Sequence, residues 1–296
     1  MENGYFIIIL YINITLMLPI APLTLKKSLL FSYAFRYIII SYSFSKKGFF
    51  MDFSFSTYTN LVEQLRLHQY TITNYKDYTK YTKAAILRHD IDFSIEDNYN
   101  FSLFEDKLGI KSTYFVLLST GFYNPMLKYN RELLKSILKI GHSIGLHFDT
   151  TAYDDWQNKI QAEKSILENI LDAPVDLISF HRPAPEILDN NLQFSGLINV
   201  YSQEFFGKFK YCSDSRFHWR DNPFELIHTG KYPYLHILTH PFAWHKTDIP
   251  PRTTYINLIS KASVERYKYY TQNIRNPEEF ITSQEANSLW NKTKEY

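Results

Sequence analysis

Short apolar runs alternate with amphipathic segments along most of the chain. The runs have the length and composition of buried strands, and they lie at residues 84–91, 112–119, 142–148, 175–180, 208–212 and 235–238. The amphipathic segments carry apolar residues at helical spacing, and they lie at residues 94–108, 129–140, 154–171, 262–270 and 277–290. Strands that alternate with helices predict parallel strands covered by helices. Residues 51–296 also have the length of a (β/α) barrel, about 250 residues.

The first fifty residues differ from the rest of the chain. Residues 5–18 are almost entirely apolar and are followed by Pro19, whereas a membrane-spanning helix needs about 20 apolar residues. A signal peptide is disfavoured because no basic residue precedes the apolar run. Two explanations stay open: a mis-assigned start, with Met51 as the natural first residue, or a membrane anchor. We therefore expect an apolar N-terminal extension at 1–50 and a barrel domain at 51–296.

Charge and cysteine content narrow the classes of function. The chain has 296 residues, with 32 Lys and Arg against 30 Asp and Glu. This balance argues against nucleic acid as a partner, because affinity for phosphate needs a basic surface. The single cysteine, Cys212, excludes a disulfide framework and a cysteine-based zinc site. It fits a cytoplasmic protein, and a genuine anchor within 1–50 would place the protein at a membrane instead.

Polar side chains gather where four of the apolar runs end. The carboxyl ends of parallel strands meet on one rim of a barrel, so we expect these side chains to lie close together. Each of them alone is more often a cap or a loop hydrogen-bonding group than a functional residue, but four successive strand ends favour a shared site. The residues are Arg88, His89, Asp90, Asp92, His147, Asp149, His181, Arg182 and His240.

This set of residue types points to metal-assisted hydrolysis. Asp90 and Asp92 are two positions apart, so both carboxylates point the same way and repel one another unless a cation lies nearby. One aspartate and two histidines are a common open zinc site, which Asp92, His147 and His181 could supply. Asp90 would then act as the base and His240 as the acid. In the alternative interpretation, Arg88 simply neutralises the aspartate pair.

The motifs resemble those of the polysaccharide deacetylase family, the carbohydrate esterases of family four. The segments RHDID, GHSIGLHF, SFHRP and THP occur in the family's order, and the resemblance covers roughly residues 84–245. It implies a distorted (β/α) barrel of about seven strands and a divalent metal, most often zinc. It also implies an N-acetylated sugar or polysaccharide as the substrate. The motif sequences most resemble those of family members associated with bacterial surface-polysaccharide gene clusters.

The resemblance also implies roles for single residues. Asp90 corresponds to the base, Asp92 and His147 to metal ligands, and His240 to the acid. Arg182 corresponds to the arginine that orients the base. The family's second ligand histidine falls on Thr151 here, and we expect His181 to replace it.

A looser fourth motif implies pocket residues that contact the substrate. For Trp219 and Trp244, packing in the core is an equal alternative to stacking on a sugar. The residues implied are Asp214, Trp219 and Trp244.

Two other functions stay open at this point. Because Thr151 stands where the resemblance expects a ligand histidine, one alternative is a non-catalytic carbohydrate-binding protein whose metal site has degraded. The apolar run at residues 5–18 favours the other alternative, a membrane-anchored assembly component.

Overall fold

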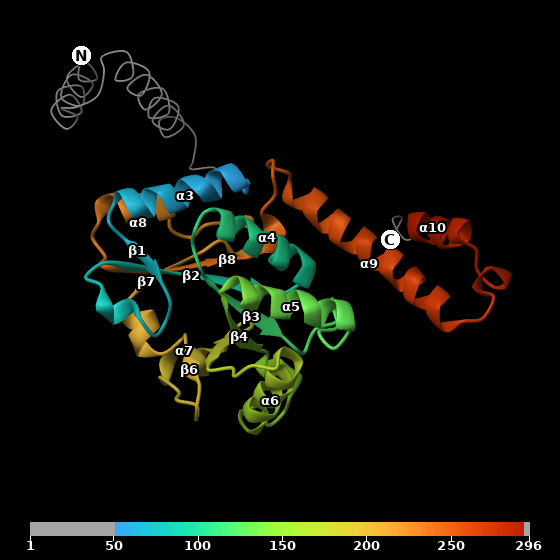
Figure 1. The fold of residues 1–296 in the computed structure, drawn as a ribbon, viewed down its shortest axis with the longest axis horizontal. Coiled ribbons are helices and arrows are strands. Elements are labelled where there is room, and N and C mark those ends of the chain that lie inside the picture. Colours follow the sequence, from blue (N-terminus) through green and yellow to red (C-terminus); the bar gives the residue numbers. More distant parts are fainter. Residues whose placement is uncertain (1–50, 293–296) are drawn as a thin grey trace, which may run out of the picture. The chain divides into compact units, whose positions relative to one another are not determined.

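The computed structural model describes residues 51–292 (Figure 1). The expectations for residues 1–50 lie outside the described residues, and the division at Met51 stays a prediction. Within 51–292, no helix has both the length and the apolar composition that a membrane span requires.

Seven strands form one parallel sheet in the order β6-β5-β4-β3-β2-β8-β7. A short strand, β1 (Thr71–Thr73), pairs with the first half of β2. The sheet curls into a half-barrel. It stays open, because within 51–292 no pairing joins β6 to β7. This confirms the predicted α/β fold with a distorted barrel of about seven strands. The seven are β2 (Ala84–Ile91), β3 (Thr113–Leu117), β4 (Ser143–Phe148), β5 (Leu177–Phe180), β6 (Ile198–Asn199), β7 (Lys210–Ser213) and β8 (Tyr234–Thr239).

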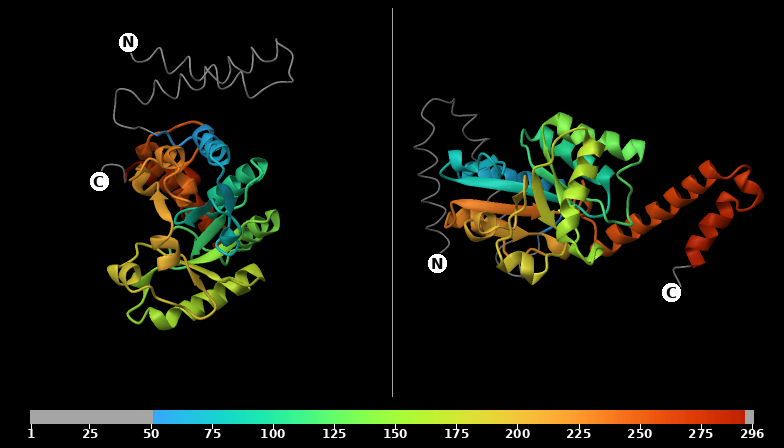
Figure 2. Two further views of the ribbon diagram at one scale, coloured as in Figure 1. Left: turned by 90° about the vertical axis from the view of Figure 1, so that its left-hand side faces the viewer. Right: turned by 90° about the horizontal axis from the view of Figure 1, so that it is seen from below.

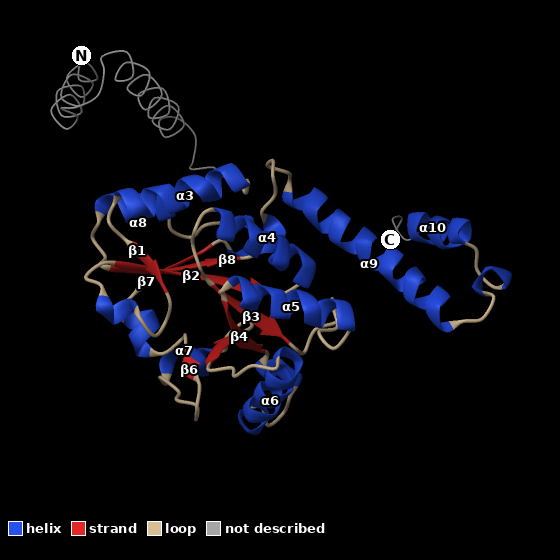
Figure 3. Ribbon diagram, in the orientation of Figure 1, coloured by secondary structure: helices blue, strands red, loops and turns tan. Residues whose placement is uncertain are grey.

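Helices cover the outside of this sheet (Figure 3). Their ends follow local sequence signals: the Ser54 and Ser94 hydroxyls cap the first turns of α3 and α4, and Gly141 ends α5 with a left-handed φ of 101°. The helices are α3 (Phe55–Leu67), α4 (Ile95–Lys107), α5 (Lys128–Ile140), α6 (Ile160–Leu171), α7 (Pro185–Asp189) and α8 (Pro223–Thr229).

The last two helices extend away from the sheet. Figures 1 and 2 show α9 (Pro251–Asn273) reaching beyond the other elements, with α10 (Ser283–Lys292) beside it. Helix α9 is much longer than the predicted segment at 262–270. Along α9 the described residues include a single buried one, Thr254, so most of this helix is open to solvent.

Strand β2 is the centre of the fold, because all eight of its residues are buried. Its side chains alternate between two apolar clusters, as the two-residue period of a strand requires. Ala84 and Ile86 belong to the cluster that also holds Phe115 and Leu146. On the other face, Leu87 belongs to the cluster beneath α3 and α4. Burial on both faces explains the continuous apolar run in the sequence.

A buried carboxylate joins β2 to the helices that cover it. Glu105 of α4 accepts hydrogen bonds from the hydroxyls of Tyr58 (2.6 Å), Tyr114 (2.7 Å) and Ser112. His89 of β2 lies 3.0 Å from the same carboxylate. Burial alone would raise the pKa of Glu105, but His89 and the other donors outweigh burial and lower this pKa to about 2. Glu105 is therefore an ionised group that fixes α4 against the sheet.

We predict that Glu105→Gln lowers the free energy of unfolding at pH 7 by about 2–4 kcal/mol, because its hydrogen-bond partners lose a buried charge. The carboxylate's contribution is present above the ordinary pKa of glutamate and is lost as the pH falls toward 2. Urea unfolding at several pH values should thus show a difference between variant and wild type that shrinks below about pH 4.5. Glu132→Gln, at an exposed position, is the control. Equal stability of Glu105→Gln and wild type at pH 7 would contradict this assignment.

Candidate active site

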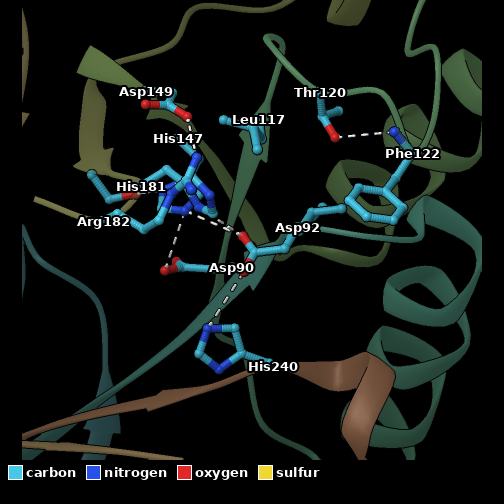
Figure 4. Close-up of polar contacts among 12 residues, drawn as sticks. Asp90, Asp92, Leu117, Thr120, Phe122, His147, Asp149, His181, Arg182 and His240 are labelled. Carbon is cyan, nitrogen blue, oxygen red and sulfur yellow. Dashed lines mark hydrogen bonds and ion pairs between the residues drawn. The ribbon is translucent and has the colours of Figure 1, made fainter. Parts of the chain in front are cut away.

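The carboxyl ends of β2, β4 and β5 bring three of the predicted ligands together (Figure 4). Asp92 Oδ1 lies 3.3 Å from His147 Nε2 and 3.5 Å from His181 Nδ1. One ligand atom from each of the three residues lies within 4.8 Å of the other two. Such a set of one carboxylate and two imidazoles suits a divalent cation.

The surroundings of the three residues also fit a metal. Ser179, the partner of His147 in the β4–β5 register, has its hydroxyl 2.7 Å from His147 Nδ1 and so turns Nε2 toward Asp92. Asp92 Oδ1 is buried and has no hydrogen-bond donor in the described part of the chain. An orphaned carboxylate oxygen between two imidazoles is a position that a cation satisfies. Burial raises the pKa of Asp92, but the two histidines outweigh it and hold this pKa well below its usual range.

Asp90 is held by an arginine that differs from the one we expected. Arg88 donates from Nε to Asp90 Oδ1 and from Nη2 to Oδ2, both at 2.8 Å, and both side chains are almost fully buried. The guanidinium also lies over the rings of Phe115 and Tyr201. Burial would raise the pKa of Asp90, but Arg88 outweighs burial and lowers it, so Asp90 is ionised.

The expectation that Arg182 orients Asp90 is therefore corrected. The Arg182 side chain is 70% exposed and donates to Asp149 Oδ2 at 3.1 Å. Arg88 is on the same strand as Asp90 and two residues away, so the period of the strand places both side chains on one face. That alternation is the sequence signal that could have identified Arg88.

His240 lies on the other side of Asp92, with its Nε2 3.8 Å from Asp92 Oδ2. Its Nδ1 lies 2.6 Å from Asp214 Oδ1, and its backbone N–H donates to Asp214 Oδ2. Burial lowers the pKa of His240, but the Asp214 carboxylate outweighs burial and raises it to about 9. His240 is thus protonated near neutral pH and is oriented by a buried carboxylate.

The expected substrate contacts of three residues are corrected by their burial. Asp214 is 1% exposed, accepts from the Trp244 indole N–H at 2.8 Å and holds His240 through the same carboxylate. Trp244 and Trp219 are 3% and 7% exposed and pack in the apolar cluster beneath α3. Both tryptophans belong to the core, which the sequence had left as an equal alternative.

Thr151 has a structural role, because it hydrogen-bonds to Asp149. It lies in a short 3₁₀ turn after β4, and its hydroxyl and backbone N–H both donate to Asp149 Oδ1. The histidine expected at this position by the resemblance is thus replaced by a residue that supports the turn. The structure places His181 beside Asp92 instead.

Comparisons with known proteins find similarity only among solved structures. No family model and no curated protein matches the sequence. A family 4 carbohydrate esterase from Bacillus anthracis is 16% identical, with a TM-score of 0.36 over 71% of this chain and 86% of its own. A chitin deacetylase from Colletotrichum lindemuthianum is 13% identical, with a TM-score of 0.36 over 60% of this chain and 81% of its own.

Pseudoenzymes occur among these neighbours as well. A family 4 pseudoenzyme from Bacillus anthracis is 16% identical, with a TM-score of 0.34, and 62% of each chain is covered. The structural neighbours thus include a family 4 carbohydrate esterase and two proteins named as deacetylases, all of them distant from this chain. The matched part spans less than two thirds of the pseudoenzyme chain. At TM-scores of 0.34–0.36 this likeness carries no conclusion about this chain, so the chemistry of the site has to follow from its own residues.

The two arginines provide a direct test of the corrected geometry. We predict that Arg88→Met lowers the free energy of unfolding by about 3–5 kcal/mol, because it leaves the Asp90 carboxylate buried and unpaired. Arg182→Met is the matched control and should cost about 1 kcal/mol or less, because Arg182 is largely exposed. Denaturant unfolding of both variants measures the difference. A larger loss in Arg182→Met than in Arg88→Met would contradict the assignment.

Proposed function

We propose that this protein is a metal-dependent hydrolase that removes an N-acetyl or similar acyl group from a sugar in bacterial surface-polysaccharide metabolism. The observation that carries the proposal is the cluster of Asp92, His147 and His181, with Asp90 and His240 beside it. The family resemblance of the motifs supports the sugar and the pathway.

Three side chains would hold the ion, through Asp92 Oδ1, His147 Nε2 and His181 Nδ1. Three protein ligands leave a coordination position open, as catalytic sites require. We propose zinc, which at such sites supplies Lewis-acid polarisation of the acyl carbonyl.

Asp90 is placed to take a proton from the attacking water. Its Oδ2 lies 3.6 Å from His147 Nε2, so the carboxylate borders the ligand cluster. Arg88 fixes both oxygens, and each keeps a lone pair to accept a proton. The ion pair keeps Asp90 ionised, which a general base requires.

His240 is placed to protonate the departing amine. Asp214 engages Nδ1 and leaves Nε2 facing Asp92. An imidazolium held in this orientation delivers its Nε2 proton to the nitrogen of the breaking amide bond. The sugar, which carries that nitrogen, therefore leaves on the His240 side of the cluster.

A non-catalytic carbohydrate-binding function is the second candidate. Thr151 stands where the resemblance expects a ligand histidine, and pseudoenzymes occur among the structural neighbours. Such a protein would contain no stoichiometric metal, and elemental analysis of the purified protein separates the two functions.

We predict that the wild-type protein binds one divalent ion and that Asp92→Ala and His181→Ala each lose it. The reason is that either change removes one of three ligands. Elemental analysis after zinc loading and gel filtration measures the stoichiometry. Thr151→Ala is the control and should keep the ion, because Thr151 donates to Asp149. Full zinc content in His181→Ala would show that the third ligand is a different residue.

We predict that Asp90→Asn and His240→Gln keep the metal and lower kcat by roughly 10²–10⁴-fold, because each removes one proton-transfer group. Amine release from an N-acetylglucosamine oligomer measures turnover, and zinc content confirms that the ligands remain in place. Retained turnover in Asp90→Asn would contradict the role of this residue as the base.

A further inference from the structure

Five aromatic side chains from separate segments pack against one another beside the site. We call these five residues, Phe93, Phe122, Phe217, Phe242 and Tyr255, the aromatic rim. Phe93 is at its centre. The Phe93 ring centroid lies 4.7 Å from that of Phe122 and 4.5 Å from that of Phe242, both in edge-to-face packing. The Tyr255 ring, at the start of α9, lies 5.9 Å from Phe242 and 5.6 Å from Phe217.

The aromatic rim borders the site on one particular side. Phe93 directly follows Asp92 in the sequence, and the Phe242 ring centroid lies 6.4 Å from that of His240. In Figure 4 the Phe122 ring lies beyond Asp92, on the side away from His147 and His181. The rim is thus next to Asp92 and His240.

Two members of the aromatic rim are open to solvent, whereas Phe242 is buried, and the exposed surface continues along α9. Phe122 and Tyr255 are 49% and 39% exposed. Ile259, four residues after Tyr255 and therefore on the same helical face, is 50% exposed. Ala262 extends the same face and is also exposed, so the apolar stripe on α9 is about 10 Å long. We take these adjoining exposed apolar side chains as one surface that a ligand can reach.

The position of the aromatic rim decides which part of the substrate meets it. His240 protonates the amine, so the sugar and whatever is attached to it lie on the His240 side. The acyl group, held at the opposite end of the breaking bond, points away from the rim. Phe122 and Tyr255, the exposed members of the rim, are therefore placed to contact the sugar or its aglycone, the group at its anomeric carbon.

The chemistry of the aromatic rim favours the aglycone. Aromatic rings can stack on the C–H face of a sugar, but the sugar's hydroxyls also need hydrogen-bonding partners, and four of the five rim residues are phenylalanines, which offer none. The α9 stripe adds aliphatic side chains at Ile259 and Ala262. A surface of this composition gains binding energy by covering an apolar chain.

We propose that the aromatic rim and the α9 stripe bind an apolar chain attached to the sugar, so that the substrate is an amphiphilic glycoside with an alkyl or isoprenoid aglycone. The inference rests on the proposed function, because His240 as the acid sets the side on which the sugar lies. It adds to that function the chemical class of the substrate.

The test compares two glycosides that differ only in the aglycone. Methyl and octyl β-N-acetylglucosaminide are assayed with the zinc-loaded full-length protein, the octyl compound below its critical micelle concentration. We expect kcat/KM to be at least about tenfold higher for the octyl glycoside. In the double variant Phe122→Ala/Tyr255→Ala this ratio should fall toward one. Leu67→Ala removes an exposed apolar side chain at the end of α3 and should keep the wild-type ratio.

Direct binding separates this inference from the proposed function. Calorimetric titration with octyl β-N-acetylglucosaminide should give a Kd at least about tenfold higher for the double variant than for Leu67→Ala, whether or not the glycoside is hydrolysed. Absence of hydrolysis together with this difference would count against the proposed function only. Equal kcat/KM and equal Kd for the methyl and octyl glycosides would overturn the inference. A double variant that changes only the sedimentation coefficient would overturn it too, since the stripe would then mediate self-association.

Discussion

Two carboxylates that point the same way from the end of β2 are the constraint on which the site depends. Asp90 and Asp92 share one face of the strand, and both are largely buried, so their charges must be compensated inside the protein. The structure compensates them in different ways. Arg88 binds Asp90 through two hydrogen bonds, whereas Asp92 has only imidazoles beside it and keeps an oxygen without a donor. This asymmetry is the reason why we propose Asp90 as the base and Asp92 as a metal ligand.

The rest of the barrel holds these two carboxylates in place. Strand β2 is buried along its whole length, and Glu105 ties its outer face to α4 through His89. On the opposite flank, Asp214 orients His240. Asp90, His147 and His240 thus each have a buried hydrogen-bond partner, and pre-organisation of this kind is what proton transfer and metal binding need.

The sequence predicted most of the fold and much of the site, for reasons that particular residues show. Buried strands such as residues 84–91 can be predicted because their apolar character is continuous. The strands β1 and β6 were missed because two or three residues are too short for a periodic pattern. Arg88 was weighed only as a neutralising charge, although the alternation of the strand already placed it beside Asp90.

Other features could not be predicted from the sequence. The burial of Trp219 and Trp244 depends on packing between segments far apart in the chain. The aromatic rim could not be predicted because aromatic residues make up 17% of the whole sequence, so its members do not stand out as a local excess.

The most direct test of the proposed metal site is X-ray absorption spectroscopy of the zinc-loaded protein. We predict one zinc ion with two imidazole nitrogens and carboxylate oxygen at about 2.0–2.2 Å, and the loss of one imidazole in His181→Ala. A spectrum with a single imidazole in the wild type, or one that is unchanged in His181→Ala, would contradict the assignment of Asp92, His147 and His181 as the ligands.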